Sequence, residues 1–154
     1  MKKVLKIKLA LFSVLLFQGI SCQKEYDKEY NWSYPLSGDW TVSISYGGEE
    51  QGKIFMKSYN SAVGQDSIWL DDNLSFFPFK FKAKADVNSR TFQSTDVVSY
   101  INDARYRDTV IVRNAKVIEK DSIYFEIEFR SDPGNPYTIS GHRRTSYDEY
   151  MGHL

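Results

Sequence analysis

Apolar and polar residues alternate along most of the chain beyond residue 35. In three segments, residues 40–46, 79–87 and 123–130, every second side chain is apolar and most of those between are hydroxyl-bearing or charged. A period of two is typical of a β-strand with one face on a core and the other in water. Weaker signals of the same kind lie near 53–59, 66–71, 91–99, 108–113, 115–119 and 137–144. The pattern therefore predicts antiparallel β-sheet.

Short polar segments separate these strands and can form the turns between them. Residues 47–52 contain three glycines, which can supply the positive φ that a hairpin turn needs. Segments 88–90, 119–121 and 132–136 punctuate the later strands, and no stretch of a dozen residues has a convincing helical period. We predict one all-β domain over residues 36–150, either a sandwich or an antiparallel meander closed into a barrel of about eight to nine strands.

One pair of positions favours the barrel. Gly38 and Trp40 open the first strand, and Arg143 lies near the end of the last one, on the core-facing side of the alternation. In a closed meander the first and last strands are neighbours, so the arginine could lie on the Trp40 ring and close one end of the barrel. This arrangement resembles the Gly-X-Trp and late-arginine signature of lipocalin and calycin barrels. A tryptophan in an ordinary sandwich core, with a solvated arginine, is the alternative.

The N-terminal segment is organised like a secretory signal. Residues 1–8 carry four lysines and no acid, and residues 9–17 are almost wholly apolar, a run shorter than the about 20 residues that span a membrane. The boundary before Cys22 resembles the lipobox of bacterial lipoproteins, whose cysteine carries acyl chains such as palmitate. We predict a signal peptide over 1–21, an acylated Cys22 with a polar tether over 22–35, and a C-terminal tail over 151–154. A free or disulfide-forming Cys22 is the alternative, although a lone cysteine cannot form an internal disulfide.

The charge balance argues against a nucleic-acid partner. Without the four lysines of the leader the chain has 16 basic and 20 acidic residues, with no basic cluster in the sequence. Acyl chains would make the membrane itself a partner, and we expect a location at the outer membrane. The charged residues 23–30 resemble the signal that exports some Bacteroidota lipoproteins to the cell surface, but they also fit a plain spacer. The periplasmic face and the cell surface thus both stay open, and the oligomeric state is not predicted.

Three segments resemble a known family. They are "LSGDWTVSI", "SIWLDDNLSFFPFKFKAKADVNSRTFQS" and "ISGHRRTSYDEY", within residues 36–150. Together they are similar to a family of small Bacteroidota lipoproteins described as lipid-binding putative hydrolases. The resemblance implies a lipocalin-like antiparallel barrel and a lipid ligand, and the name adds hydrolysis. No catalytic residues come with it.

The sequence itself offers little catalytic chemistry. There is no Gly-X-Ser-X-Gly elbow and no His-Glu-X-X-His motif. His142 is expected on the strand surface, and His153 lies at the frayed C-terminus. Asp71 and Asp72 could hold a cation or act on a glycoside, but a turn in which they bind their own backbone is the favoured interpretation. We predict no metal, no cofactor and no catalytic residue.

Bulky apolar side chains favour binding over catalysis. The candidate lining of a ligand pocket is Phe79, Phe81, Ala83, Phe125 and Phe129, and small inward residues, including Gly141, could leave room for a ligand. A barrel of about eight strands can hold one small ligand or be filled by its own side chains. We therefore expect a lipid-anchored barrel that binds a small apolar or lipid ligand. A surface interaction protein with a filled core is the alternative, and a hydrolase with an unrecognised site ranks last.

Overall fold

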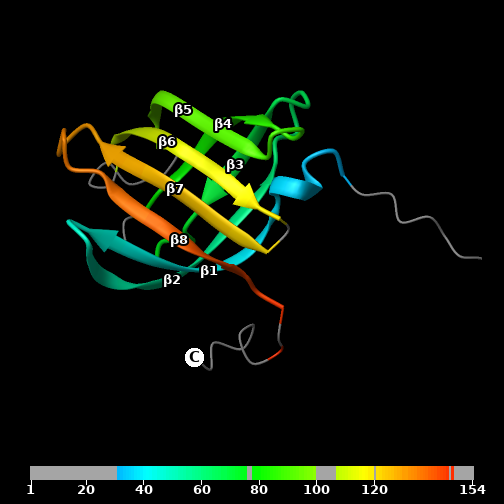
Figure 1. The fold of residues 1–154 in the computed structure, drawn as a ribbon. Coiled ribbons are helices and arrows are strands. Elements are labelled where there is room, and N and C mark those ends of the chain that lie inside the picture. Colours follow the sequence, from blue (N-terminus) through cyan, green and yellow to red (C-terminus); the bar gives the residue numbers. More distant parts are fainter. Residues whose placement is uncertain (1–30, 76–77, 100–106, 120, 146, 148–154) are drawn as a thin grey trace, which may run out of the picture.

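The computed structural model describes residues 31–75, 78–99, 107–119, 121–145 and 147, and its framework is a set of antiparallel strands (Figure 1). A short 3-10 helix, η2 (Tyr34–Leu36), precedes them. The strands are β1 (Gly38–Tyr46), β2 (Glu49–Asn60), β3 (Ser67–Asp71), β4 (Lys80–Asp86), β5 (Thr91–Val98), β6 (Thr109–Ile118), β7 (Ser122–Phe129) and β8 (Tyr137–Arg143). The predicted signal peptide, Cys22, the tether up to residue 30, His153 and the tail 151–154 lie outside the described residues. Within them, no helix is long and apolar enough to cross a membrane.

The eight strands form a closed meander. Each strand pairs with the next along the chain, and β8 returns to pair with β1, so the order around the barrel is the order in the sequence. The pairing of segments 39–46 and 137–144 that the sequence predicted is present, with Ile44 opposite Ile139 and Trp40 opposite Arg143. The prediction of an all-β antiparallel barrel is confirmed, and the sandwich alternative is excluded.

The predicted strand boundary between residues 113 and 115 is not present in the structure. The sequence predicted separate strands at 108–113 and 115–119, but these residues belong to one strand. Its pairing with β7 shifts between Arg113 and Lys116, and Asn114 between them has a φ of 53°. A left-handed residue in a strand is typical of a bulge, which changes the facing of the side chains without ending the strand. The prediction of two strands there was wrong because the bulge interrupts the period of two.

The interior is packed with the apolar side of every strand. In β1 the predicted inward residues Trp40, Val42 and Ile44 are buried, but Thr41 is buried as well and Tyr46 is 38% exposed. In β7 the alternation holds, with Ile123, Phe125 and Ile127 each at most 1% exposed. The buried apolar residues of all eight strands form one continuous core together with Leu36 of η2. Because the domain has no disulfide, burial of this apolar surface is the main source of its stability.

The two ends of the barrel differ. The end where β1 begins carries η2, Trp40 and the end of β8, and we call it the plugged end. Strands β1, β3, β5 and β7 finish at the opposite end, which we call the mouth and which lies on the left in Figure 1. Any site inside the barrel must therefore be reached from the mouth or through the wall.

Candidate functional site

The plugged end is closed by Trp40 and Arg143. The guanidinium carbon of Arg143 lies 4.6 Å from the centroid of the Trp40 ring, within the range of a cation–π contact. The indole Nε1 donates a hydrogen bond of 2.8 Å to Ser58 Oγ, which in turn donates one of 2.6 Å to the carbonyl of Leu36. Arg143 also donates to the carbonyl of Ser37. The ring is fully buried, so the contact seals this end and ties η2 to the barrel.

Gly38 belongs to the same cluster. A Cβ built on Gly38 would lie 2.5 Å from Nη1 of Arg143 and 3.3 Å from the Trp40 ring. Glycine thus leaves the space in which the guanidinium lies. The structure brings together the three residues that the sequence placed at a closing end, Gly38, Trp40 and Arg143.

Four of the five candidate lining residues lie in the packed interior. Phe79, Phe81, Ala83 and Phe125 are each at most 1% exposed. Phe79 packs against Phe81 at 5.5 Å between ring centroids, and Phe125 packs against Phe92 at 5.6 Å. Their side chains contribute to the core as it stands, and a lining role for them stays a prediction.

Gly141 does not leave room for a ligand. A Cβ at this position would lie 2.6 Å from the Cα of Val42 and still closer to the carbonyl oxygen of Thr41. The space beside Gly141 is filled by the backbone of β1, its partner strand. The expectation that this glycine adds to a cavity was wrong, because the glycine serves close approach of two strands.

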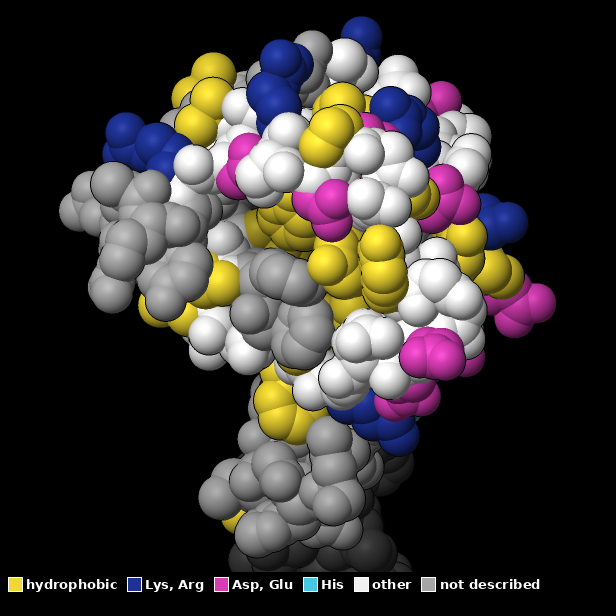
Figure 2. Space-filling view, turned by 90° about the vertical axis from the view of Figure 1, so that its left-hand side faces the viewer, with side chains coloured by type: hydrophobic (Ala, Val, Ile, Leu, Met, Phe, Trp, Pro, Cys, Tyr) yellow, Lys and Arg dark blue, Asp and Glu magenta, His cyan; other side chains and the backbone are white. Residues whose placement is uncertain are grey.

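The fifth candidate, Phe129, lies at the mouth in a cluster of three aromatic rings. Its ring centroid is 6.1 Å from that of Tyr137, whose centroid is 5.0 Å from that of Tyr46. Phe129 and Tyr137 are half-buried against the core, and Tyr46 is 38% exposed. Figure 2 looks at the mouth and shows apolar side chains gathered in a recess among polar and acidic ones. We call Tyr46, Phe129 and Tyr137 the mouth cluster.

The surroundings of Tyr137 are apolar enough to affect its titration. Burial raises the pKa of its hydroxyl above the ordinary value, and the negative charge of Asp132 adds to this. Burial of an acid in an apolar site disfavours its charged form. Tyr137 thus presents a neutral hydroxyl and an apolar ring at the mouth. Sequence reasoning missed Tyr46 and Tyr137 as site residues, although both are the inward position nearest the mouth on their strands.

A second unpredicted residue is Ser94 on β5. Its side chain is 6% exposed, and its Oγ has no hydrogen-bond partner among the residues that the structure describes. An unpaired buried hydroxyl costs about 1–3 kcal/mol, so such groups are rare without a reason. Nothing in the period-two pattern marks Ser94, because serine is also common on outer faces.

The wall beside Ser94 is less tightly paired than elsewhere. Strands β4 and β5 pair over three positions, from Lys84 opposite Gln93 to Asp86 opposite Thr91. By comparison, β4 pairs with β3 over Lys80 to Lys84, and β5 pairs with β6 from Thr91 to Val98 with two register shifts. The β4–β5 ladder therefore ends one residue before Ser94, and at the mouth the backbone N–H of Lys80 donates a hydrogen bond of 3.2 Å to Ser99 Oγ.

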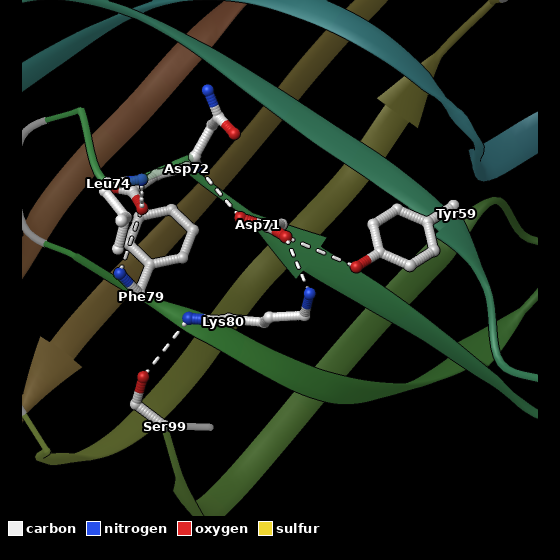
Figure 3. Close-up of polar contacts among 8 residues, drawn as sticks. Tyr59, Asp71, Asp72, Leu74, Phe79, Lys80 and Ser99 are labelled. Atoms are coloured by element: carbon white, nitrogen blue, oxygen red, sulfur yellow. Dashed lines mark hydrogen bonds and ion pairs between the residues drawn. The ribbon is translucent and has the colours of Figure 1, made fainter. Parts of the chain in front are cut away.

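The Asp71 and Asp72 pair forms a turn, as the favoured interpretation predicted. Asp71 accepts a hydrogen bond from the backbone of Asn73, and the buried Asp72 accepts bonds of 3.0 and 3.1 Å from the backbones of Leu74 and Phe79 (Figure 3). Both carboxylates are thus used to fasten the chain between β3 and β4. The described residues contain no group of three or more His, Cys, Asp or Glu placed to hold a metal ion.

Asp71 also organises two side chains on the outside of the barrel. Its Oδ2 accepts a hydrogen bond of 3.3 Å from the Tyr59 hydroxyl and pairs with Lys80 Nζ at 3.1 Å (Figure 3). Hydrogen bonding to Tyr59 and to Asp71 raises the pKa of Lys80. His142 is exposed on β8, as expected of a surface residue. None of these groups forms a catalytic arrangement with a nucleophile and base.

An open hollow of about 820 Å³ lies across strands β4 to β7. Polar and charged side chains predominate around it, and its lining is Lys84, Ala85, Asp86, Thr91, Phe92, Gln93, Asn114, Ala115, Lys116, Tyr124 and Glu126. Within it, Glu126 accepts hydrogen bonds from Asn114 and Tyr124. The apolar recess at the mouth is therefore the better match for an apolar ligand.

Comparison with known proteins identifies one family. No curated protein matches the chain. The sequence model of one family, described as lipid-binding putative hydrolase, matches residues 25–148. That range contains the whole barrel, with its plugged end, its mouth cluster and Ser94. The chain belongs to the lipid-binding putative hydrolase family.

Proposed function

We propose that this protein binds the apolar chain of a lipid at the mouth of its barrel. The observation that carries the proposal is the mouth cluster, in which the Tyr137 ring packs against both Tyr46 and Phe129 at the end opposite the Trp40 plug. Ligand sites are typically concave and apolar, with a few polar groups that orient the ligand. Membership in a lipid-binding family is consistent with this site.

The depth of binding depends on the packed interior. Phe81, Ala83 and Phe125 are fully buried, so a ligand chain that enters the barrel must displace side chains there. Ser94 supplies an unused hydroxyl on the inside of the wall. We propose that the chain lies against the mouth cluster and that its polar end hydrogen-bonds to Ser94 Oγ when the ligand penetrates further.

We further propose that the barrel is attached to the outer membrane through acylated Cys22. The basic residues 1–8, the apolar run 9–17 and the boundary before Cys22 support this attachment. Several acyl chains would make the attachment durable, because each buried CH₂ contributes about 0.8 kcal/mol. The attachment would keep the mouth close to a source of lipid.

A protein–protein interaction role is the second candidate. The observation that favours it is the filled interior, in which four of the five predicted lining residues are at most 1% exposed. In that case the ligand site would be absent, and the function would belong to the outer surface. A hydrolase with an unrecognised site ranks last, because the described residues offer no nucleophile and base to support it.

Native mass spectrometry distinguishes lipid binding at the mouth from the protein–protein interaction role. The full chain carrying Cys22→Ser is mixed with a fatty acid, a phospholipid and a monoacylglycerol in turn. We expect a one-to-one adduct that is weakened by Tyr137→Ala or Tyr46→Ala. Tyr124→Ala is the matched control, because Tyr124 is a tyrosine on the outer face of β7. A folded protein that forms no adduct with any of the three lipids would favour the interaction role.

A further inference from the structure

The outward face of strands β2 to β4 is basic and aromatic. The buried residues of these strands, such as Met56, Leu70 and Phe81, alternate with outward side chains. Those outward side chains include five lysines, two large aromatic residues and two aspartates, Asp71 and Asp86, so positive charge is in excess. We call the lysines and the aromatic residues the basic face: Lys53, Lys57, Tyr59, Trp69, Lys80, Lys82 and Lys84.

The strand register gathers these side chains around Trp69. Trp69 lies opposite Tyr59 on β2 and opposite Lys82 on β4. Lys82 Nζ is 4.9 Å from the Trp69 ring centroid, and Lys80 Nζ is 5.9 Å from it. Residues from three consecutive strands thus form one patch, with an indole ring at its centre.

Most of the positive charge on this face is not neutralised. Lys80 pairs with Asp71, but Lys53, Lys57, Lys82 and Lys84 form no ion pair with any residue that the structure describes. The face made by β6 and β7 differs. There Arg113 pairs with Glu128 at 2.5 Å, and Glu126 accepts two hydrogen bonds. A chain whose acidic residues outnumber the basic ones beyond the leader therefore concentrates unpaired positive charge on one side.

We propose that the basic face docks on the surface of an anionic membrane. Lysines near such a surface are attracted by its phosphate headgroups, each by about fivefold in affinity. Tryptophan and tyrosine favour the boundary between headgroups and acyl chains, and lysine can extend its charged end outward while its stem covers apolar surface. The combination of lysines around Trp69 and Tyr59 fits a lipid surface better than a hydrated polyanion, which offers no apolar layer for the rings.

The position of the basic face adds to the argument. Strand β4 carries three of its lysines, and the pairing of the same strand with β5 covers only three positions. Docking through β2 to β4 would therefore bring that less tightly paired part of the wall, and Ser94 behind it, near the membrane. The proposal concerns the outside of the barrel, so it does not depend on the proposed ligand site.

Vesicle binding tests the docking surface. The full chain with Cys22→Ser is sedimented with vesicles of phosphatidylcholine alone or with 30% phosphatidylglycerol, a fraction of about one anionic lipid in three, which makes the surface potential strongly negative. Binding to the phosphatidylcholine vesicles measures the contribution of the apolar run at residues 9–17. We expect the protein to bind the anionic vesicles more tightly than the phosphatidylcholine vesicles. A Lys82→Glu, Lys84→Glu double variant should lower the affinity for the anionic vesicles by at least about tenfold. Lys116→Glu is the control, since Lys116 is an exposed lysine on β6, outside the basic face and separated from β4 by β5, and it should change binding less than about threefold.

A second readout separates membrane from polyanion. Brominated phosphatidylglycerol should quench tryptophan fluorescence on binding, and Trp69→Phe should remove most of that quenching. Equal binding to both vesicle types, or equal losses in the β4 and Lys116 variants, would overturn the proposal. Charge-dependent binding to dextran sulfate with no quenching by the vesicles would assign the face to a soluble polyanion instead. Measuring the lipid adduct of the same variants shows separately whether the ligand site is intact.

Discussion

Arg143 lies over the Trp40 ring, with its guanidinium carbon 4.6 Å from the ring centroid, although the two residues belong to the last and the first strand of the chain. The contact exists only because β8 pairs with β1. It closes the plugged end, and the hydrogen bonds through Ser58 extend it to η2. A barrel closed at one end leaves its mouth as the natural place for a ligand.

Trp40→Ala should strongly destabilise the barrel. The ring is fully buried, and truncation of a buried aromatic residue costs about 3–5 kcal/mol. Chemical denaturation followed by circular dichroism gives the free energy of unfolding. Trp69→Ala, on the outer face, is the control and should cost less than half as much. Equal losses in the two variants would contradict the plug.

Gly141→Ala should disrupt the pairing of β1 with β8. The added Cβ would lie 2.6 Å from the Cα of Val42, and the backbone of a paired strand cannot move away without loss of hydrogen bonds. Gly134→Ala is the comparison: it has a φ of +83° and open space around its Cβ, so it should cost only about 1 kcal/mol. Thermal melting of both variants checks this, and a mild effect of Gly141→Ala would mean that the two strands do not approach so closely.

Substitution by alanine should lower the stability of the barrel at Ser58 but not at Ser94. Ser58→Ala leaves the Trp40 Nε1 and the Leu36 carbonyl without their partner, at a cost of about 2–3 kcal/mol. Ser94→Ala removes a hydroxyl that has no partner among the described residues, so stability should stay within about 1 kcal/mol of the parent or rise. Urea unfolding compares the two. A large loss in Ser94→Ala would show that its hydroxyl is already bonded in the ligand-free protein.

Asp108 should make stability sensitive to acid. Burial acts to raise its pKa, but hydrogen bonds from Ser131 and from the backbone of Thr109 outweigh burial and lower the pKa below its ordinary value of 3.8. A lowered folded-state pKa contributes stability above the unfolded-state value, and that contribution is lost as the pH falls through the folded-state value. We expect Asp108→Asn to flatten the fall in unfolding free energy below about pH 4.

Ser131→Ala is the matching variant for that measurement, because it removes a donor to the Asp108 carboxylate. Ser131→Ala should partly reduce the fall in unfolding free energy over the same pH range. Unfolding titrations at pH 3 to 7 give the comparison (about the range over which a carboxylate changes charge). Identical pH slopes for the parent and Asp108→Asn would refute the role of this carboxylate.

The local alternation of apolar and polar residues was enough to predict most of the strands of the barrel. The alternation in residues 40–46, 79–87 and 123–130 predicted strands that the structure contains as β1, β4 and β7, because a strand with one face on a core requires a period of two. The closing pair could also be anticipated, since position in the chain alone makes the first and last strands of a closed meander neighbours. The bulge at Asn114 could not be anticipated from the sequence, because it depends on how β6 pairs with β7.

The sequence by itself determined the fold class from periodicity, the turn at Asp71 and Asp72 from contacts within a few residues, and the closing residues from their places in the first and last strands. Only the tertiary structure decided which apolar residues remain accessible. Phe81 and Phe125 are fully buried, whereas Phe129, Tyr46 and Tyr137 meet at the mouth. Period two tells which face of a strand is inward but not how far along the barrel axis a residue lies. That height is set by the register of all eight strands together, and it decides whether an inward side chain fills the core or meets a ligand.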